Sequence, residues 1–188
     1  MRIGNSTSPL FKAKYINYTE IRKKDFYPNY LRKQASFIQI EPENDYDINA
    51  LEDISNYWTA GGFAKNIYYM ACAIRNKSKF YKNHKVYALT SQKEDFEKPD
   101  SRKFLGIIGI CQENENKTFI EYIQANPEII YSREPEFKGI GTAIMDSLKN
   151  LCEKIYCYPS QTKSVIDFYL KNGFVKKPDT LNHYFWEK

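Results

Sequence analysis

The chain has 188 residues, of which 42% are hydrophobic and 27% charged, and its net charge is +5. These values are typical of one soluble domain with a sizeable core. The sequence has no run of about 18 apolar residues, which excludes a transmembrane helix, and its start lacks the apolar stretch of a secretory signal. We therefore expect a cytoplasmic protein with no membrane partner.

The sequence spaces its cysteines and histidines widely. They are Cys72, His84, Cys111, Cys152, Cys157 and His183. A zinc site needs about four ligands at close spacing, so we expect free thiols and no metal site. Two histidines also leave little room for Ser-His or Cys-His nucleophilic catalysis.

The positive charge is concentrated at the N-terminus. Residues 1–34 contain eight Lys or Arg and two acids, so this segment carries +6 and residues 35–188 sum to −1. We therefore divide the chain into a basic N-terminal extension, 1–34, and a domain, 35–188. Such an arm allows a contact with nucleic acid, although a solvent-facing extension is the more ordinary interpretation of a charge cluster.

Hydrophobic periodicity then predicts the elements of the domain. In chain order they are a strand over 35–40, helices from Ile48 to Trp58 and from Phe63 to Ile74, strands over 85–90, 104–112 and 118–125, a helix from Lys138 to Cys152, a strand over 155–158, a helix over 162–172, and strands over 174–176 and 182–186. Asp47 is expected to cap the first helix. This order predicts an α/β fold, with a mixed, mostly antiparallel sheet and helices on its faces.

A glycine motif precedes the third predicted helix. Residues 136–143 read EFKGIGTA, with glycines at 139 and 141. Glycines let a backbone approach a ligand closely, and the free N–H groups and dipole of a helix start attract anions such as a pyrophosphate. A dinucleotide-binding motif would have its third glycine where Ile144 stands, and the P-loop pattern is absent.

A second motif lies one helix and one strand later, where residues 167–174 read DFYLKNGF. Together the two motifs resemble the GNAT superfamily of N-acyltransferases, which carries Q/R-x-x-G-x-G/A before one helix and a pattern like F-Y-x-x-x-G-F at the end of a later one. The resemblance is firm over residues 104–186, weaker over 35–103 and absent over 1–34. It implies a single GNAT-like domain with splayed central strands and acetyl-CoA as cosubstrate.

The sequence departs from the family pattern at Glu136, where the family usually has Gln or Arg. A carboxylate beside a pyrophosphate is unfavourable. Three explanations are open: Glu136 points away, Arg133 compensates its charge, or coenzyme A binds more weakly than usual.

The resemblance also implies a set of cofactor-binding residues. They are Ile123, Gln124 and Ala125 on the splayed strand, and Arg133, Lys138, Gly139, Ile140, Gly141, Thr142, Ala143, Thr162 and Lys171. Thr162 is equally explained as a helix N-cap. Lys171, like Lys163, is equally explained as a solvent-facing lysine.

Two residues are candidates for catalysis by this resemblance. Tyr169 stands where the family often has a general acid that protonates the departing thiolate; alternatively it is a core tyrosine. Glu121 is a candidate general base, and strand alternation would put it on one face with Ile123 and Ala125; alternatively it makes a cross-strand ion pair. A backbone N–H near Ala125 would meet the oxyanion.

The function implied is transfer of an acetyl group from acetyl-CoA to a primary amine of a small molecule or peptide. Acids near the first helix would suit a cationic acceptor. They are Glu41, Glu43, Asp45, Asp47, Glu52 and Asp53. Two alternatives stay open: an inactive acyl-CoA-binding sensor or scaffold, and a nucleic-acid-associated protein that works through the basic arm. The sheet edges at the C-terminal strands also allow a homodimer.

Overall fold

The computed structural model describes residues 13–25, 29–59, 62–114, 116–178 and 180–188. The elements are β1 (Lys14–Lys24), β2 (Tyr30–Ile40), α1 (Asp45–Tyr57), α2 (Phe63–Arg75), β3 (His84–Thr90), β4 (Phe104–Asn114), β5 (Lys117–Ala125), α3 (Pro127–Ile130), β6 (Phe137–Lys138), α4 (Ile140–Leu151), β7 (Lys154–Cys157), α5 (Lys163–Lys171), β8 (Val175–Lys176) and β9 (Tyr184–Glu187), with short 3-10 turns at Lys79–Tyr81 and Ser101–Lys103. No described helix is long and apolar enough to cross a membrane.

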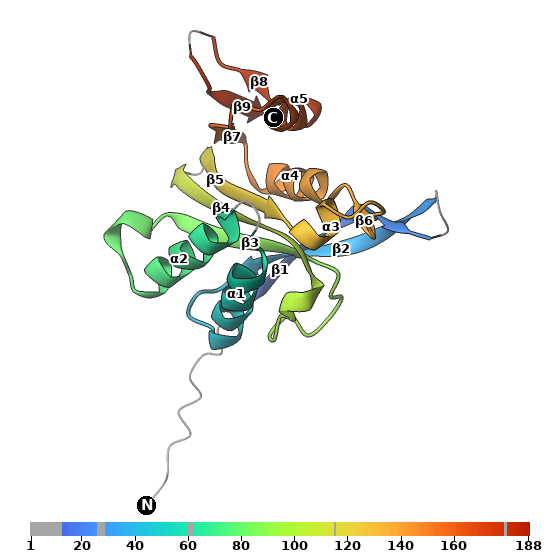
Figure 1. Cartoon of the computed structure of the whole chain (residues 1–188). Helices are drawn as coiled ribbons and strands as arrows, with labels where there is room; N and C mark the ends of the chain where they lie inside the picture. Colours follow the sequence, from blue (N-terminus) through green and yellow to red (C-terminus); the bar gives the residue numbers. More distant parts are fainter. Residues whose placement is uncertain (1–12, 26–28, 60–61, 115, 179) are drawn as a thin grey trace, which may run out of the picture.

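One nine-stranded sheet organises the chain, in the order β6-β1-β2-β3-β4-β5-β7-β9-β8. All neighbouring pairs are antiparallel except β5 and β7, which run parallel. Helices α1 and α2 cover one face of the sheet, and α4 and α5 cover the other (Figure 1). This arrangement confirms the predicted α/β class with a mixed, mostly antiparallel sheet.

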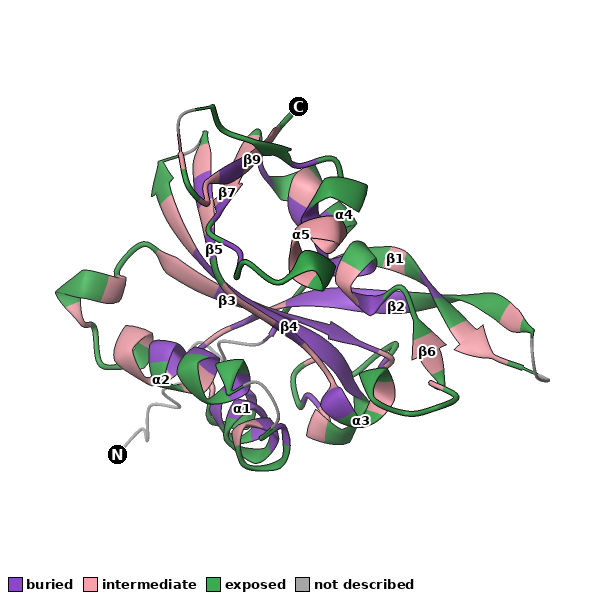
Figure 2. Ribbon diagram, turned by 45° about the horizontal axis from the view of Figure 1, so that its top comes forward, coloured by how far each residue is buried: buried purple, intermediate pink, exposed green. Residues whose placement is uncertain are grey.

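Each face of the sheet has its own apolar core (Figure 2). On one face, Leu51 of α1 and Ile67 of α2 are fully buried against the sheet. On the other, Ile144 and Leu148 of α4 are fully buried. The apolar periodicity of these helices in the sequence therefore corresponds to real packing faces.

The N-terminal part of the fold differs from the expectation. Residues 14–24 form β1, which pairs with β2, and the expected boundary between residues 34 and 35 lies inside β2. In β1 only Ile21 is buried and the other residues are partly or fully exposed, so the strand tolerates a basic sequence. Residues 1–12 of the expected extension lie outside the described residues.

Acidic residues of the chain also balance part of the basic charge of the hairpin that β1 and β2 form. Lys24 forms an ion pair with Glu134, Lys23 with Glu136 at 3.3 Å, and Arg32 with Glu20 at 3.3 Å.

The start of the first helix is a second difference. The N-cap of α1 is Asn44, whose side chain accepts a hydrogen bond from the Tyr46 N–H, so the prediction of Asp47 as the cap is wrong. Asp47 is fully buried in the first turn, and its carboxylate accepts hydrogen bonds from the Glu41 N–H and the Asn44 amide, each at 2.8 Å. Burial raises the pKa of Asp47 to about 7.

Candidate active site

The sheet splays open beside β5. Strand β5 pairs with β7 only over Thr118–Ile120, although its pairing with β4 continues to Ala125. Among the described strands, the pairing with β7 ends at Ile120, so the β7 side of Ile123 and Ala125 is open to a ligand that adds as a further strand. The splay that the GNAT resemblance implies is present.

The first of two cavities at the splay is the glycine-loop cavity, which has a volume of about 640 Å³. It contains seven of the predicted cofactor-binding residues: Ile123, Ala125, Lys138, Gly139, Ile140, Gly141 and Thr142. The start of α4 forms one wall, where the N–H groups of the first turn have no carbonyl partner in their own helix. The first intrahelical bond runs from the Ala143 N–H to the Gly139 carbonyl, at 2.9 Å.

Each glycine of the motif has its own structural reason. Gly139 is the N-cap of α4 with φ +82°, a left-handed conformation that favours glycine. Gly141 lies against α5, because a Cβ added there would approach a ring carbon of Phe168 to 2.7 Å. One glycine therefore shapes the loop, and the other lets two helices approach closely.

Five predicted cofactor-binding residues do not line the glycine-loop cavity: Arg133, Ala143, Thr162, Lys171 and, as described below, Gln124. Ala143 is buried in the core, and Arg133 and Lys171 are exposed without lining the cavity. Thr162 occupies the N-cap position of α5, yet its hydroxyl contacts Ser160 at 3.1 Å and makes no capping bond. A bound coenzyme A could reach them only beyond the walls of this cavity.

Gln124 turns its side chain away from the glycine loop and bridges β5 to the two N-terminal helices. Its amide oxygen accepts a hydrogen bond from the Ala64 N–H at 2.7 Å, and its amide nitrogen donates to the Trp58 carbonyl at 3.3 Å. Only the backbone of Gln124 is placed to contact a ligand in the splay.

The position of Glu136 answers the question that the sequence left open. Its carboxylate pairs with Lys23 of β1 and lines a separate cavity with that lysine, so Glu136 points away from the glycine loop. Arg22, the neighbour of Lys23 on β1, lines the glycine-loop cavity instead and is the register partner of Lys138. The hairpin therefore contributes a cation to the cavity, which the sequence did not reveal because residue 22 lies 116 positions before Lys138.

The second cavity, which we call the splay cavity, has a volume of about 260 Å³. Both predicted catalytic residues, Glu121 and Tyr169, line it. It shares Ile123, Val165 and Phe168 with the glycine-loop cavity, so the two cavities meet at these side chains. Phe63 at the start of α2 and Tyr158 after β7 provide aromatic walls.

Tyr169 is held by aromatic neighbours. It is only 5% exposed and makes edge contacts with Phe168 and Phe174 at ring-centroid distances of 5.1 and 5.2 Å. Burial, with a smaller contribution from the Cys157 thiol, raises the pKa of the Tyr169 phenol above its usual value. The phenol therefore stays protonated over the whole physiological range, which keeps in place the proton that the acid role requires, while the same shift makes the phenol a weaker acid.

Glu121 lies at a bulge of β5. The pairing with β4 shifts between Ile110, opposite Ile120, and Gly109, opposite Tyr122. The shift breaks the alternation of side chains, so the expectation that Glu121, Ile123 and Ala125 share a face is wrong. Ile123 and Ala125 pack on the α4 side, whereas Glu121 reaches His84 of β3.

The Glu121 carboxylate contacts His84 Nε2 at 3.0 Å, so the cross-strand partner expected under the alternative interpretation is present. Cys111 of β4 lies beside them, and the ligand atoms of the three residues are within 4.8 Å of one another. Burial, then the carboxylates of Glu121 and Glu113, raise the pKa of the Cys111 thiol. No local sequence pattern indicates this cluster, because 27 and 10 residues separate its members.

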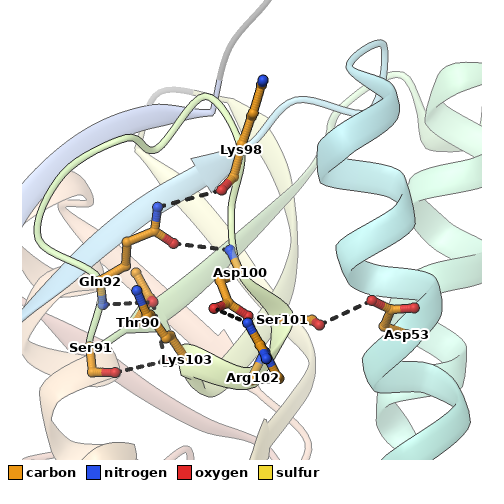
Figure 3. A network of polar contacts seen from close by, with 9 residues as sticks. All are labelled: Asp53, Thr90, Ser91, Gln92, Lys98, Asp100, Ser101, Arg102 and Lys103. Carbon is orange, nitrogen blue, oxygen red and sulfur yellow. Dashed lines mark hydrogen bonds and ion pairs between the residues drawn. The ribbon is translucent and has the colours of Figure 1, made fainter.

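The acids around α1 do not converge on either cavity. Asp45 pairs with Arg75, and Asp53 accepts a hydrogen bond from the Ser101 hydroxyl at 3.0 Å. Figure 3 shows Asp53 facing the loop after β3, which Gln92 organises by accepting from the Asp100 N–H at 3.0 Å. Asp45 therefore ties α1 to α2, and Asp53 ties α1 to this loop.

Comparisons with solved structures found several proteins with a similar fold. The chain is similar to the N-acetyltransferase PseH of Campylobacter jejuni, with 12% identity, coverage of 80% of this chain and 94% of that one, and a TM-score of 0.50. It is also similar to a spermidine N-acetyltransferase SpeG chimera from Vibrio cholerae and hSSAT, with 13% identity, 82% and 96% coverage, and a TM-score of 0.52.

A third similar structure is a mutant of the AtaT toxin bound to the C-terminus of the antitoxin AtaR, with 13% identity, 82% and 92% coverage, and a TM-score of 0.51. No protein-family model and no curated protein sequence matches the chain. The fold is that of the GNAT N-acetyltransferases, as the two sequence motifs predicted.

Proposed function

We propose that the protein is an N-acetyltransferase that moves an acetyl group from acetyl-CoA to a primary amine. One observation carries the proposal: the cationic glycine-loop cavity meets, at Ile123, Val165 and Phe168, a smaller cavity that contains a protonated tyrosine and a carboxylate. A donor with an anionic end and a reactive end fits this pair of cavities. The similar N-acetyltransferase structures support the same reaction class.

In this proposal, acetyl-CoA lies across both cavities. Its pyrophosphate meets the first turn of α4, with Arg22 and Lys138 adding positive charge. The pantetheine arm follows β5 past the end of its pairing with β7, along Ile123 and Ala125. The thioester then reaches the splay cavity, beside Glu121 and Tyr169.

The reaction is direct transfer in a ternary complex. The amine nitrogen attacks the thioester carbonyl, an N–C bond forms, and a proton of the amine passes to Glu121, directly or through water. Backbone N–H groups of the splayed strand stabilise the oxyanion. The C–S bond then breaks, and the Tyr169 phenol gives its proton to the departing sulfur, so that an amide and free coenzyme A are released.

Calorimetric titration with acetyl-CoA tests the first half of the proposal. Thr142 is an exposed residue of the first turn of α4 that lines the glycine-loop cavity, so Thr142→Glu places a negative charge at the expected pyrophosphate. Asn150→Glu makes the same change on the exposed far end of α4 and is the matched control. A change at Gly141 is less informative, because it would also disturb Phe168.

We expect binding to wild type and to Asn150→Glu, and little or none to Thr142→Glu. The proposal fails if acetyl-CoA does not bind the wild-type chain. A screen of amines with thiol detection of coenzyme A then tests transfer. Tight binding without release of coenzyme A for any amine would favour the acyl-CoA-binding sensor instead.

A further inference from the structure

The cluster of His84, Cys111 and Glu121 joins three neighbouring strands at the centre of the sheet, β3, β4 and β5 (Figure 1). His84 and Cys111 are register partners across β3 and β4. His84 lies two positions before Val86, which packs under α1 and α2, so strand alternation places the cluster on that face of the sheet. The backbone of three paired strands fixes the three side chains relative to one another.

The imidazole of His84 is held in place by its surroundings. The side chain is only 9% exposed, and its ring lies 4.7 Å from the ring of Tyr81. Its Nδ1 atom is buried without a hydrogen-bond partner among the described residues. The 3.0 Å contact between Nε2 and the Glu121 carboxylate requires a proton between the two atoms, and a metal cation could occupy the place of that proton.

We infer that His84, Cys111 and Glu121 form an exchangeable binding site for a divalent ion of the zinc type. An imidazole nitrogen, a thiolate and a carboxylate are the three ligand types that zinc takes in proteins, and three protein ligands with one open position are typical of a reactive site. Glu121 also lines the splay cavity, from which water can supply the fourth ligand.

The buried Nδ1 atom limits the affinity of this site. A histidine that binds a metal through Nε2 usually donates its other N–H to an acceptor, and the loss of such an acceptor typically weakens metal binding about 10- to 100-fold. Nδ1 of His84 has no acceptor among the described residues. The site is therefore suited to reversible occupation and not to a permanently held ion.

Occupation of the site would have a consequence for transfer, which rests on the proposed function. Glu121 cannot bind a metal ion and accept a proton from the amine at the same time. The ion therefore acts as an inhibitor that removes the base, while the glycine-loop cavity on the other side of Ile123 remains able to bind acetyl-CoA.

Metal binding is tested on the full chain without any acceptor or acetyl-CoA. Calorimetric titration with zinc should give one site per chain, and cobalt should give a visible spectrum with a sulfur-to-cobalt charge-transfer band. Cys111→Ser and His84→Gln should weaken binding about 10-fold or more. Cys72→Ser is the matched control, because Cys72 is another free and partly exposed cysteine outside the cluster.

The inference is overturned if cobalt gives no charge-transfer band, or if Cys111→Ser and Cys72→Ser bind zinc equally well. In a transfer assay, zinc should lower kcat for wild type and leave Cys111→Ser much less affected. If no amine is acetylated under any condition, the transferase proposal fails while the metal titration still decides the binding site.

Discussion

The two cavities at the splay differ in how the chain builds them. The glycine-loop cavity is large, has basic residues on its wall, and takes most of its lining from the continuous segment between β5 and the first turn of α4. The splay cavity is less than half that volume, is aromatic and carries a carboxylate, and its walls come from α2, β5, the loop after β7, and α5. The proposed donor subsite therefore depends mainly on one local segment, whereas the proposed reaction site depends on elements from several parts of the fold.

The largest expected effect is in the splay cavity. Tyr169→Phe removes the proposed proton donor, so kcat should fall about 10²- to 10⁴-fold, while acetyl-CoA should bind as in wild type. Steady-state kinetics and calorimetry measure the two quantities. Tyr158→Phe is the control, since this tyrosine lines the same cavity with an exposed ring. An unchanged kcat in Tyr169→Phe would remove this residue from the mechanism.

The role of Phe168, which lies between the two cavities, can be tested by a change at Gly141. Gly141→Ala forces Phe168 to move, and such overpacking typically lowers the free energy of unfolding by about 1–3 kcal/mol. Because Phe168 lines both cavities, KM should rise for both acetyl-CoA and the amine. Gly139→Ala is the comparison. Its cost comes from the backbone at φ +82°, and among the described residues no atom beyond its chain neighbours lies within 4 Å of the new Cβ, so the amine KM should not change. Equal effects of both variants on the amine would contradict this view of Phe168.

Two neighbouring basic residues of β1 test whether only the glycine-loop cavity binds acetyl-CoA, because they line different cavities. Arg22→Ala should weaken acetyl-CoA binding about 10-fold, which corresponds to roughly 1.4 kcal/mol, because Arg22 lines the glycine-loop cavity. Lys23→Ala should change it little, because Lys23 pairs with Glu136 on another surface. Both affinities come from one calorimetric series. The reverse order of effects would mean that Glu136 faces the ligand after all.

The smallest effect concerns pH. The raised pKa of Tyr169 keeps its proton above pH 10, where an ordinary tyrosine is half ionised. The acid form therefore persists as pH increases, and kcat should rise as the amine loses its proton and show no decrease below about pH 10. A decrease between pH 8 and 10 that disappears in Tyr169→Phe would show that burial does not protect the phenol.

The sequence predicted the parts that depend on local patterns. The EFKGIGTA segment, the helix after it and the splayed strand are where the periodicity and the GNAT resemblance put them. Strand β1 was not predicted, because its basic side chains suggested a solvated arm. A strand whose side chains are mostly in contact with solvent can nevertheless carry basic residues. The side of the sheet on which Glu121 lies was not predictable either. A bulge depends on how two strands pair, and it cannot be recognised from the alternation of polar and apolar residues in one strand.

Under the proposed function, the bridge made by Gln124 bears on how an amine would enter the splay cavity. Its hydrogen bonds to Trp58 and Ala64 hold the splayed strand against the start of α2 in a buried setting, where breaking them without replacement is costly. The start of α2, which contributes Phe63 to the wall of the splay cavity, is therefore anchored to β5. Under the proposed function, an amine would enter past Tyr158 and Ser160, which line the same cavity and are exposed to solvent, so these two residues would limit the size of the acceptor.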